Sequence, residues 1–208
     1  MNQNQVLWTE TTKKIFFGVL LYSIAGILHS IVAPVSSLIG SMSDMASFAS
    51  GGKESVGDGL QIFVYLLLAG IVGGYILYFI GLTAFAKILD KDDGKAVLNV
   101  RLGAILMMIA AVVSELASSI AGGIIYLIGF IIMMLGFSKL KKSSSFPTKA
   151  TKGASKLFVA MVLAIIGAIV GLIPLVGAVI EGILDIISFI LILSGWATIK
   201  NAGQRLNA

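Results

Sequence analysis

The sequence predicts an all-α, polytopic membrane protein with six transmembrane helices arranged as three helical hairpins. Hydrophobic residues make up 58% of the 208 residues and charged residues only 12%, whereas soluble domains average about 25% charged residues. Six long apolar runs follow one another along the chain, and the Lys and Arg residues gather at their ends. Because a soluble domain of this length cannot bury so much apolar surface, we expect the runs to lie in a membrane.

Each apolar run is read as a membrane-spanning helix, because about 20 residues cross the hydrocarbon core and the backbone must satisfy its own hydrogen bonds there. The chain is therefore one transmembrane domain, 1–208, with spans near 15–39, 60–88, 98–120, 123–140, 157–180 and 183–199. The turns predicted at 118–122 and 179–182 are short. They join the third span to the fourth, and the fifth to the sixth, as antiparallel hairpins.

The orientation follows from the Lys and Arg residues of the short loops, which favour the cytoplasmic side. Fourteen of the 15 basic residues fall on one predicted side, and only Lys53 falls on the other. We therefore expect a protein of the plasma or inner membrane with both termini cytoplasmic, an exoplasmic loop at 40–59 and a cytoplasmic loop at 141–156. Basic loops of this kind also attract anionic lipid headgroups.

The exoplasmic segment is the longest loop of the prediction. Leu38, Met42, Met45 and Ala49 recur at helical spacing, which indicates a short amphipathic helix on the outer membrane surface. An extension of the first helix beyond the membrane explains the pattern equally well.

An internal repeat is suggested by a shift of 59 residues, which aligns the second predicted hairpin with the third. Identical residues then coincide: Leu98 with Leu157, Val100 with Val159, Gly123 with Gly182, Phe130 with Phe189, Ile131 with Ile190 and Gly136 with Gly195. Apolar sequences of low complexity also match by chance, so a true duplication and a chance similarity both stay open.

Small residues predict where helices approach one another, because close backbone packing drives helix association in lipid. Gly70 and Gly74 form one GxxxG motif, and Gly167 and Gly171 form another. We expect all four glycines at helix contacts. Packing within one bundle and packing between copies in a homo-oligomer both account for them.

Polar side chains at membrane depth are few, and they share one level near the outer side. His29 follows Ile15 by 14 residues, and Glu115 follows Arg101 by 14 residues, which is about 21 Å at 1.5 Å per residue. A small outward-facing vestibule for a ligand or ion is predicted from five residues: His29, Glu115, Tyr126, Glu181 and Asp185. Alternatively, the carboxylates of this layer reach water directly at an outer loop.

The remaining composition excludes several chemistries. The chain has no Cys and one His, so neither thiolate sites nor two-histidine metal sites exist, and no cofactor or metal is expected. No nucleotide-binding or nucleophile-elbow motif occurs. The net charge of +5 is spread over the ends of the spans, so nucleic acid is not an expected partner.

Two functions remain, and neither is enzymatic. The inner halves of the spans are almost purely aliphatic, whereas a path for a hydrophilic solute needs polar lining on both sides of the midplane. We therefore expect an accessory or interaction subunit that binds a partner protein or a lipophilic ligand within the membrane. A small channel or transporter with an outward-facing polar vestibule is the alternative. Membrane lipids are the expected partners, together with another membrane protein or a second copy.

Overall fold

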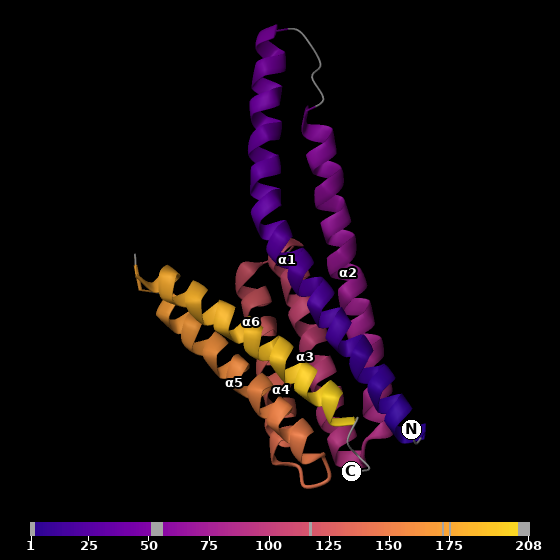
Figure 1. The fold of residues 1–208 in the computed structure, drawn as a ribbon. Helices are drawn as coiled ribbons and strands as arrows, with labels where there is room; N and C mark the ends of the chain where they lie inside the picture. The colour runs from indigo at the N-terminus through magenta and orange to yellow at the C-terminus, as the bar shows by residue number, and fades with distance from the viewer. Residues whose placement is uncertain (1–2, 51–55, 117, 172, 175, 204–208) are drawn as a thin grey trace. The chain divides into compact units, whose positions relative to one another are not determined.

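The structure is a computed structural model that describes residues 3–50, 56–116, 118–171, 173–174 and 176–203. Its described part is all-helical, as predicted, and contains no strand (Figure 1). The helices are α1 (Gln3–Ser50), α2 (Val56–Ile88), α3 (Lys91–Leu116), α4 (Ser119–Lys142), α5 (Thr148–Gly171) and α6 (Gly177–Ala202).

Among the described residues, five helices are long and apolar enough to cross a membrane. These segments are Gln5–Ser41 in α1, Leu60–Ile88 in α2, Ser119–Lys142 in α4, Thr148–Gly171 in α5 and Val179–Ala202 in α6. Helix α3, which contains most of the predicted third span, begins with the charged residues Lys91, Asp92 and Asp93. Long apolar helices fit the membrane location expected from the composition.

The connections between helices differ from the predicted turns. Helix α5 ends at Gly171 and α6 begins at Gly177, so residues 179–182 are helical rather than a turn. Pro174 explains the earlier end of α5, because its ring has no N–H to continue the helix. At the other hairpin, Ser118 caps α4 by accepting a hydrogen bond from the Ala121 N–H at 3.4 Å.

The cytoplasmic loop predicted at 141–156 is much shorter in the structure. Helix α4 continues to Lys142 and α5 starts at Thr148. Only the serine-rich segment ending in Pro147 interrupts the helices, because a proline disfavours the helical conformation of the residue before it.

Helix α1 runs without interruption through Pro34 to Ser50. Of the two predictions for the segment after residue 38, the structure therefore matches the extension of the first helix. Its 48 residues correspond to about 72 Å at 1.5 Å per residue, more than twice the thickness of the hydrocarbon core. The side chains of 42–50 lie outside the described part.

The chain divides into two compact units, which are described separately. Unit 1 contains residues 1–16 and 79–208, and unit 2 contains residues 17–78. In unit 2, α1 packs on α2 through Gly18 and Gly74: a Cβ atom at Gly18 would lie 2.7 Å from the carbonyl oxygen of Gly74. The rings of Tyr22 and Tyr75 stack beside this contact with centroids 4.5 Å apart, and Tyr78 meets Tyr22 edge-on.

The described residues of unit 1 include two further places where one glycine lies against another. In the α3/α4 pair, a Cβ atom at Gly129 would lie 2.7 Å from the carbonyl oxygen of Gly103. In the α5/α6 pair, a Cβ atom at Gly153 would lie 2.7 Å from the carbonyl oxygen of Gly195. Each pair of helices therefore approaches backbone to backbone, which only glycine permits. Figure 1 shows α5 and α6 running side by side.

The two helix pairs of unit 1 bury corresponding residues. On the first helix of each pair these are Ala96, Val100 and Gly103 in α3, and Gly153, Leu157 and Ala160 in α5. On the second helix they are Gly129, Gly136 and Phe137 in α4, and Ser188, Gly195 and Trp196 in α6. Gly136 faces Val100 as Gly195 faces Leu157. The packing thus relates α4 to α6 by the predicted 59 residues, whereas α3 and α5 are related by 57.

One end of unit 1 brings distant parts of the chain together. The Trp8 ring packs edge-on against Phe85 at 4.9 Å and also contacts Phe146. Its indole N–H donates to the carbonyl oxygen of Ile199 at 2.9 Å. The start of α1, the end of α2, the α4–α5 loop and the end of α6 therefore meet at the same end of the unit.

Candidate functional site

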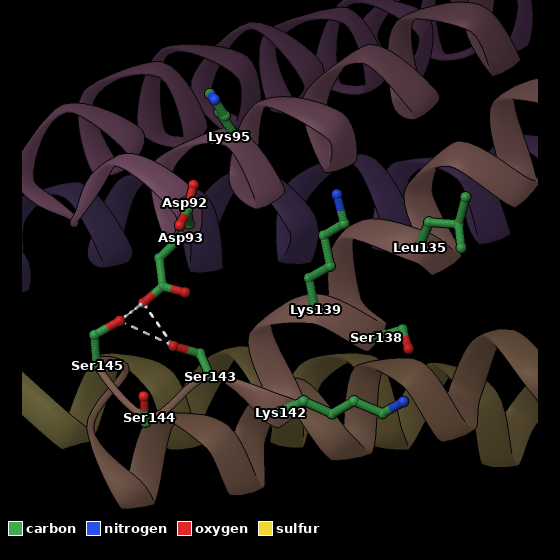
Figure 2. Close-up of a pocket in the computed structure, with 10 residues that line it drawn as sticks. All are labelled: Asp92, Asp93, Lys95, Leu135, Ser138, Lys139, Lys142, Ser143, Ser144 and Ser145. Carbon is green, nitrogen blue, oxygen red and sulfur yellow. Dashed lines mark hydrogen bonds between the residues drawn. The ribbon is translucent and has the colours of Figure 1, made fainter.

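A cavity of about 550 Å³ lies at this region of unit 1, between the start of α3, the end of α4 and the loop after α4. We call it the loop cavity. Its lining residues are Asp92, Asp93, Lys95, Leu135, Ser138, Lys139, Lys142, Ser143, Ser144 and Ser145 (Figure 2). Cavities of this size are typical of small-molecule sites.

Asp93 organises the wall of the loop cavity. Its side chain is buried, and its Oδ2 atom accepts hydrogen bonds from the Ser143 hydroxyl at 2.9 Å and the Ser145 hydroxyl at 2.8 Å. The backbone N–H of Phe146 donates to the Ser143 hydroxyl oxygen at 3.1 Å. A carboxylate in the first turn of a helix is also stabilised by the helix dipole. Asp93 thus holds the loop against α3, as Figure 2 shows.

Three lysines line the same cavity from two helices. Lys95 stands on α3, while Lys139 and Lys142 extend from the last turn of α4. Within the described residues, none of the three ammonium groups forms a hydrogen bond or an ion pair. Asp92 and Asp93 share the lining with these three lysines, so one net positive charge is left for a ligand or solvent.

Other basic side chains of unit 1 bind neutral hydroxyls between helices. The Lys156 ammonium donates to Ser194 at 2.7 Å and to Thr198 at 3.3 Å. The Arg101 guanidinium donates to the Thr83 hydroxyl at 2.9 Å. These contacts fix cations in partly buried positions, so they serve helix packing rather than an open site.

The predicted vestibule residues divide between the two units. Tyr126, Glu181 and Asp185 belong to unit 1, and Asp185 is near enough to Tyr126 to interact electrostatically. His29 belongs to unit 2. The side chain of Glu115, near the end of α3, lies outside the described part. The vestibule that joins all five residues therefore stays a prediction.

The predicted packing glycines have unequal surroundings. A Cβ atom at Gly74 would meet the α1 backbone at Tyr22, and one at Gly70 would lie 3.2 Å from the Cβ of Ala25. Gly171 faces the carboxylate of Glu181, and a Cβ atom at Gly167 would lie 3.6 Å from that of Leu184. The GxxxG motif of α5 thus lies against side chains of α6 rather than its backbone.

Sequence reasoning missed the loop cavity because its parts lie far apart in the chain. In the sequence, Lys95, Lys139 and Lys142 belong to the basic residues that indicate membrane orientation and attract lipid headgroups, and nothing there places them around one cavity. The sequence offers an aspartate near the start of the third apolar segment as a signal, but only the fold shows that Asp93 is buried and faces Ser143, 50 residues later.

Among the described residues, no group of three or more His, Asp or Glu side chains is placed to hold a metal ion. The long apolar helices fit the class of helical membrane proteins. Comparison with protein-family models, with curated proteins and with solved structures finds no match for this chain. Its function must therefore be argued from its own residues.

Proposed function

We propose that the chain is a non-enzymatic, six-span membrane protein that binds a partner protein or a lipophilic ligand within the membrane. The observation that carries this proposal is the small number of polar side chains buried between the helices. Only five described polar or charged side chains are buried: Gln5, Thr11, Thr12, Asp93 and Ser188. Thr11 and Thr12 bond to carbonyl oxygens of their own helix, so they line no polar path.

The apolar outer faces supply the surface for such binding. Large aliphatic side chains are exposed on every helix, such as Leu66 on α2, Ile124 on α4 and Ile186 on α6. Lipid covers faces of this kind by default, and a partner or ligand replaces lipid where packing against it is better.

The six-span arrangement as three hairpins is part of the proposal. Two contacts in the α1/α2 pair support it, since Gly74 lies against Gly18 and Gly81 lies against Ile15. The second-helix glycines are seven residues apart, as Gly129 and Gly136 are in α4. Repetition of one packing pattern in three pairs favours a tandem repeat of hairpins.

Both termini are placed on the cytoplasmic side in this proposal. The contacts of Trp8 with Phe85, Phe146 and Ile199 gather four segments that each carry basic residues at one end of unit 1. Such a gathering fits a single basic, cytoplasmic side. Cysteines introduced at Ser47 and Ser144 of this Cys-free chain should label from opposite sides of sealed cells, with Ser47 labelled from outside. Labelling of both from one side would contradict the topology.

Binding at an apolar face is tested by photo-crosslinking in native membranes. A photoreactive phenylalanine at Leu66, Ile124 or Ile186 should give a discrete product from at least one of these positions. Lys149, exposed on α5, is the control position outside the apolar faces. Only a smear of bulk-lipid products from all three apolar positions would contradict the proposal.

A channel or transporter with an outward vestibule is the second candidate. It is favoured by the two carboxylates of α6, because Glu181 faces Gly171 and the Asp185 Oδ1 lies 3.9 Å from a Cβ position at Gly167. Ion flux into liposomes containing the protein, lost in Glu181→Gln and Asp185→Asn, would favour this function over the first. Flux equal to that of empty liposomes would remove it.

A further inference from the structure

The loop cavity combines positive charge with an adjacent apolar surface. Its lining contains three lysines and two aspartates, and its three ammonium groups have no partner among the described residues. The Asp93 carboxylate is satisfied by Ser143 and Ser145. The lining therefore carries a net charge of one positive unit, which a singly charged anion would balance.

The apolar surface begins directly beside the lysines on both helices. On α3, Leu98 and Leu102 are exposed and follow Lys95 by three and seven residues. On α4, Leu135 and Ile131 are exposed and precede Lys142 by seven and eleven residues. Residues at these spacings share one face of a helix. Each helix thus presents a charged end that continues into an aliphatic face.

We propose that the loop cavity binds the phosphate headgroup of an anionic phospholipid, whose acyl chains lie along the exposed faces of α3 and α4. Lys95, Lys139 and Lys142 attract the phosphate as point charges, and basic cavities at the cytoplasmic ends of membrane helices suit such headgroups. A soluble phosphate compound would use the lysines but not the aliphatic faces, so the geometry favours a lipid.

The serines and Asp93 act as the frame of this site. The Asp93 carboxylate fixes Ser143 and Ser145, and so sets the position of the loop that closes one wall. Ser138 and Ser144 also line the cavity, and their hydroxyls are able to donate to phosphate oxygens. The site therefore offers hydroxyl donors beside its lysines, on a loop that Asp93 holds in position.

This inference rests on the membrane location and orientation proposed above, but not on the identity of any partner. The cysteine-labelling experiment tests the orientation separately. A failure of lipid binding with correct labelling would thus remove the headgroup site alone.

The test uses the purified full chain in neutral detergent, titrated with phosphatidylglycerol, which carries one negative charge. The melting temperature of the wild type should rise with this lipid, because a ligand of the folded state stabilises it. Phosphatidylcholine, which has no net charge, should give no comparable rise. An equal rise with phosphatidylcholine would overturn the proposal.

The decisive variants remove two charges at different places. Lys139→Gln/Lys142→Gln removes them from the cavity, and Lys149→Gln/Lys152→Gln removes them from exposed positions at the start of α5. At about fivefold per lysine, the cavity variant should need about 25-fold more phosphatidylglycerol for the same rise. The α5 variant should respond like the wild type. Equal responses of the two variants would overturn the proposal.

Two further arms keep the result unambiguous. If the double cavity variant does not fold, the single Lys142→Gln variant should still need about fivefold more phosphatidylglycerol for the same rise. An unshifted titration would count against the site.

Inorganic phosphate at the same concentrations should leave the melting temperature unchanged. A rise equal to that caused by phosphatidylglycerol would assign the cavity to soluble phosphate and overturn the lipid site.

Discussion

The α3/α4 and α5/α6 pairs pack to the same plan with different small residues at the points of contact. Where Gly103 faces Gly129 in α3/α4, the corresponding residues of α5/α6 are Ala160 and Ser188, and the Ser188 hydroxyl donates to the Ala160 carbonyl oxygen at 3.3 Å. Seven residues further along the second helices, Gly136 corresponds to Gly195, which lies against Gly153. The contact between two glycine backbones in α5/α6 therefore lies seven residues further along the second helix than the corresponding contact in α3/α4.

The comparison shows which features of the contact the two helix pairs share. Both pairs keep small residues on the second helix at seven-residue spacing, opposite one large buried aliphatic residue, Val100 or Leu157. The identity of each small residue varies with how closely the backbones approach. In α3/α4 both points are close, because a Cβ atom at Gly136 would also lie 2.7 Å from the carbonyl oxygen of Ala96. In α5/α6 only the point at Gly195 is occupied by glycine, and the small side chain of Ser188 suffices at the other.

The largest effect is expected where two glycine backbones touch. A Cβ atom at Gly103 would collide with the carbonyl oxygen of Gly129, and backbone cannot move aside as a side chain does. We expect Gly103→Ala and Gly129→Ala each to destabilise the protein by about 1–3 kcal/mol, the usual cost of overpacking. Thermal melting in detergent measures the loss.

Gly123→Ala on α4 is the matched control, because nothing lies within 4 Å of its Cβ position. It should melt at or slightly above the wild-type temperature, since alanine favours the helix. Melting of Gly103→Ala like this control would refute the backbone contact.

The second effect concerns the polar link between Asp93 and the loop after α4. Asp93 on α3 corresponds to the buried Ala150 on α5, but only Asp93 accepts hydrogen bonds from the following loop. Asp93→Ala should cost about 1–2 kcal/mol, because it removes a charged acceptor of two hydrogen bonds. Asp92→Ala, at the exposed neighbouring position, should cost clearly less. Equal melting temperatures of the two variants would mean that the link contributes nothing.

The third effect is smaller and concerns the hydrogen bond from Ser188 to Ala160, which in α5/α6 lies where Gly129 meets Gly103 in α3/α4. Ser188→Ala removes the hydrogen bond to Ala160, and hydrogen bonds between membrane helices average about 0.6 kcal/mol. The melting temperature should therefore fall only slightly. Thr198→Ala on the same helix removes a contact to Lys156 at 3.3 Å and provides a comparison of similar size. A large loss for Ser188→Ala would show that this hydrogen bond contributes far more than such bonds usually do, and would contradict the expectation.

The sequence predicts the helical class because the apolar runs and the placement of charges are local features of the order of residues along the chain. The sequence also aligns Gly136 with Gly195 at the 59-residue shift, but it does not predict the seven-residue spacing of the small residues. It does not reveal the packing of Gly103 on Gly129 or of Asp93 on Ser143, because these pairs lie on different helices and neither forms a local motif. The turn at 179–182 was misplaced for a related reason, since Pro174 was counted within a span rather than as its end.

The smallest effect separates the GxxxG motif of α5 from the closer glycine contacts. A Cβ atom at Gly167 would lie 3.6 Å from the Cβ of Leu184, which is ordinary van der Waals contact. Gly167→Ala therefore adds a methyl group without a collision, and it also gains helix propensity. We expect a change in stability within about 0.5 kcal/mol of zero, measured by thermal melting in detergent. Destabilisation as large as that of Gly103→Ala would mean that α5 and α6 approach at the motif itself, and that GxxxG, rather than the seven-residue spacing, governs this pair.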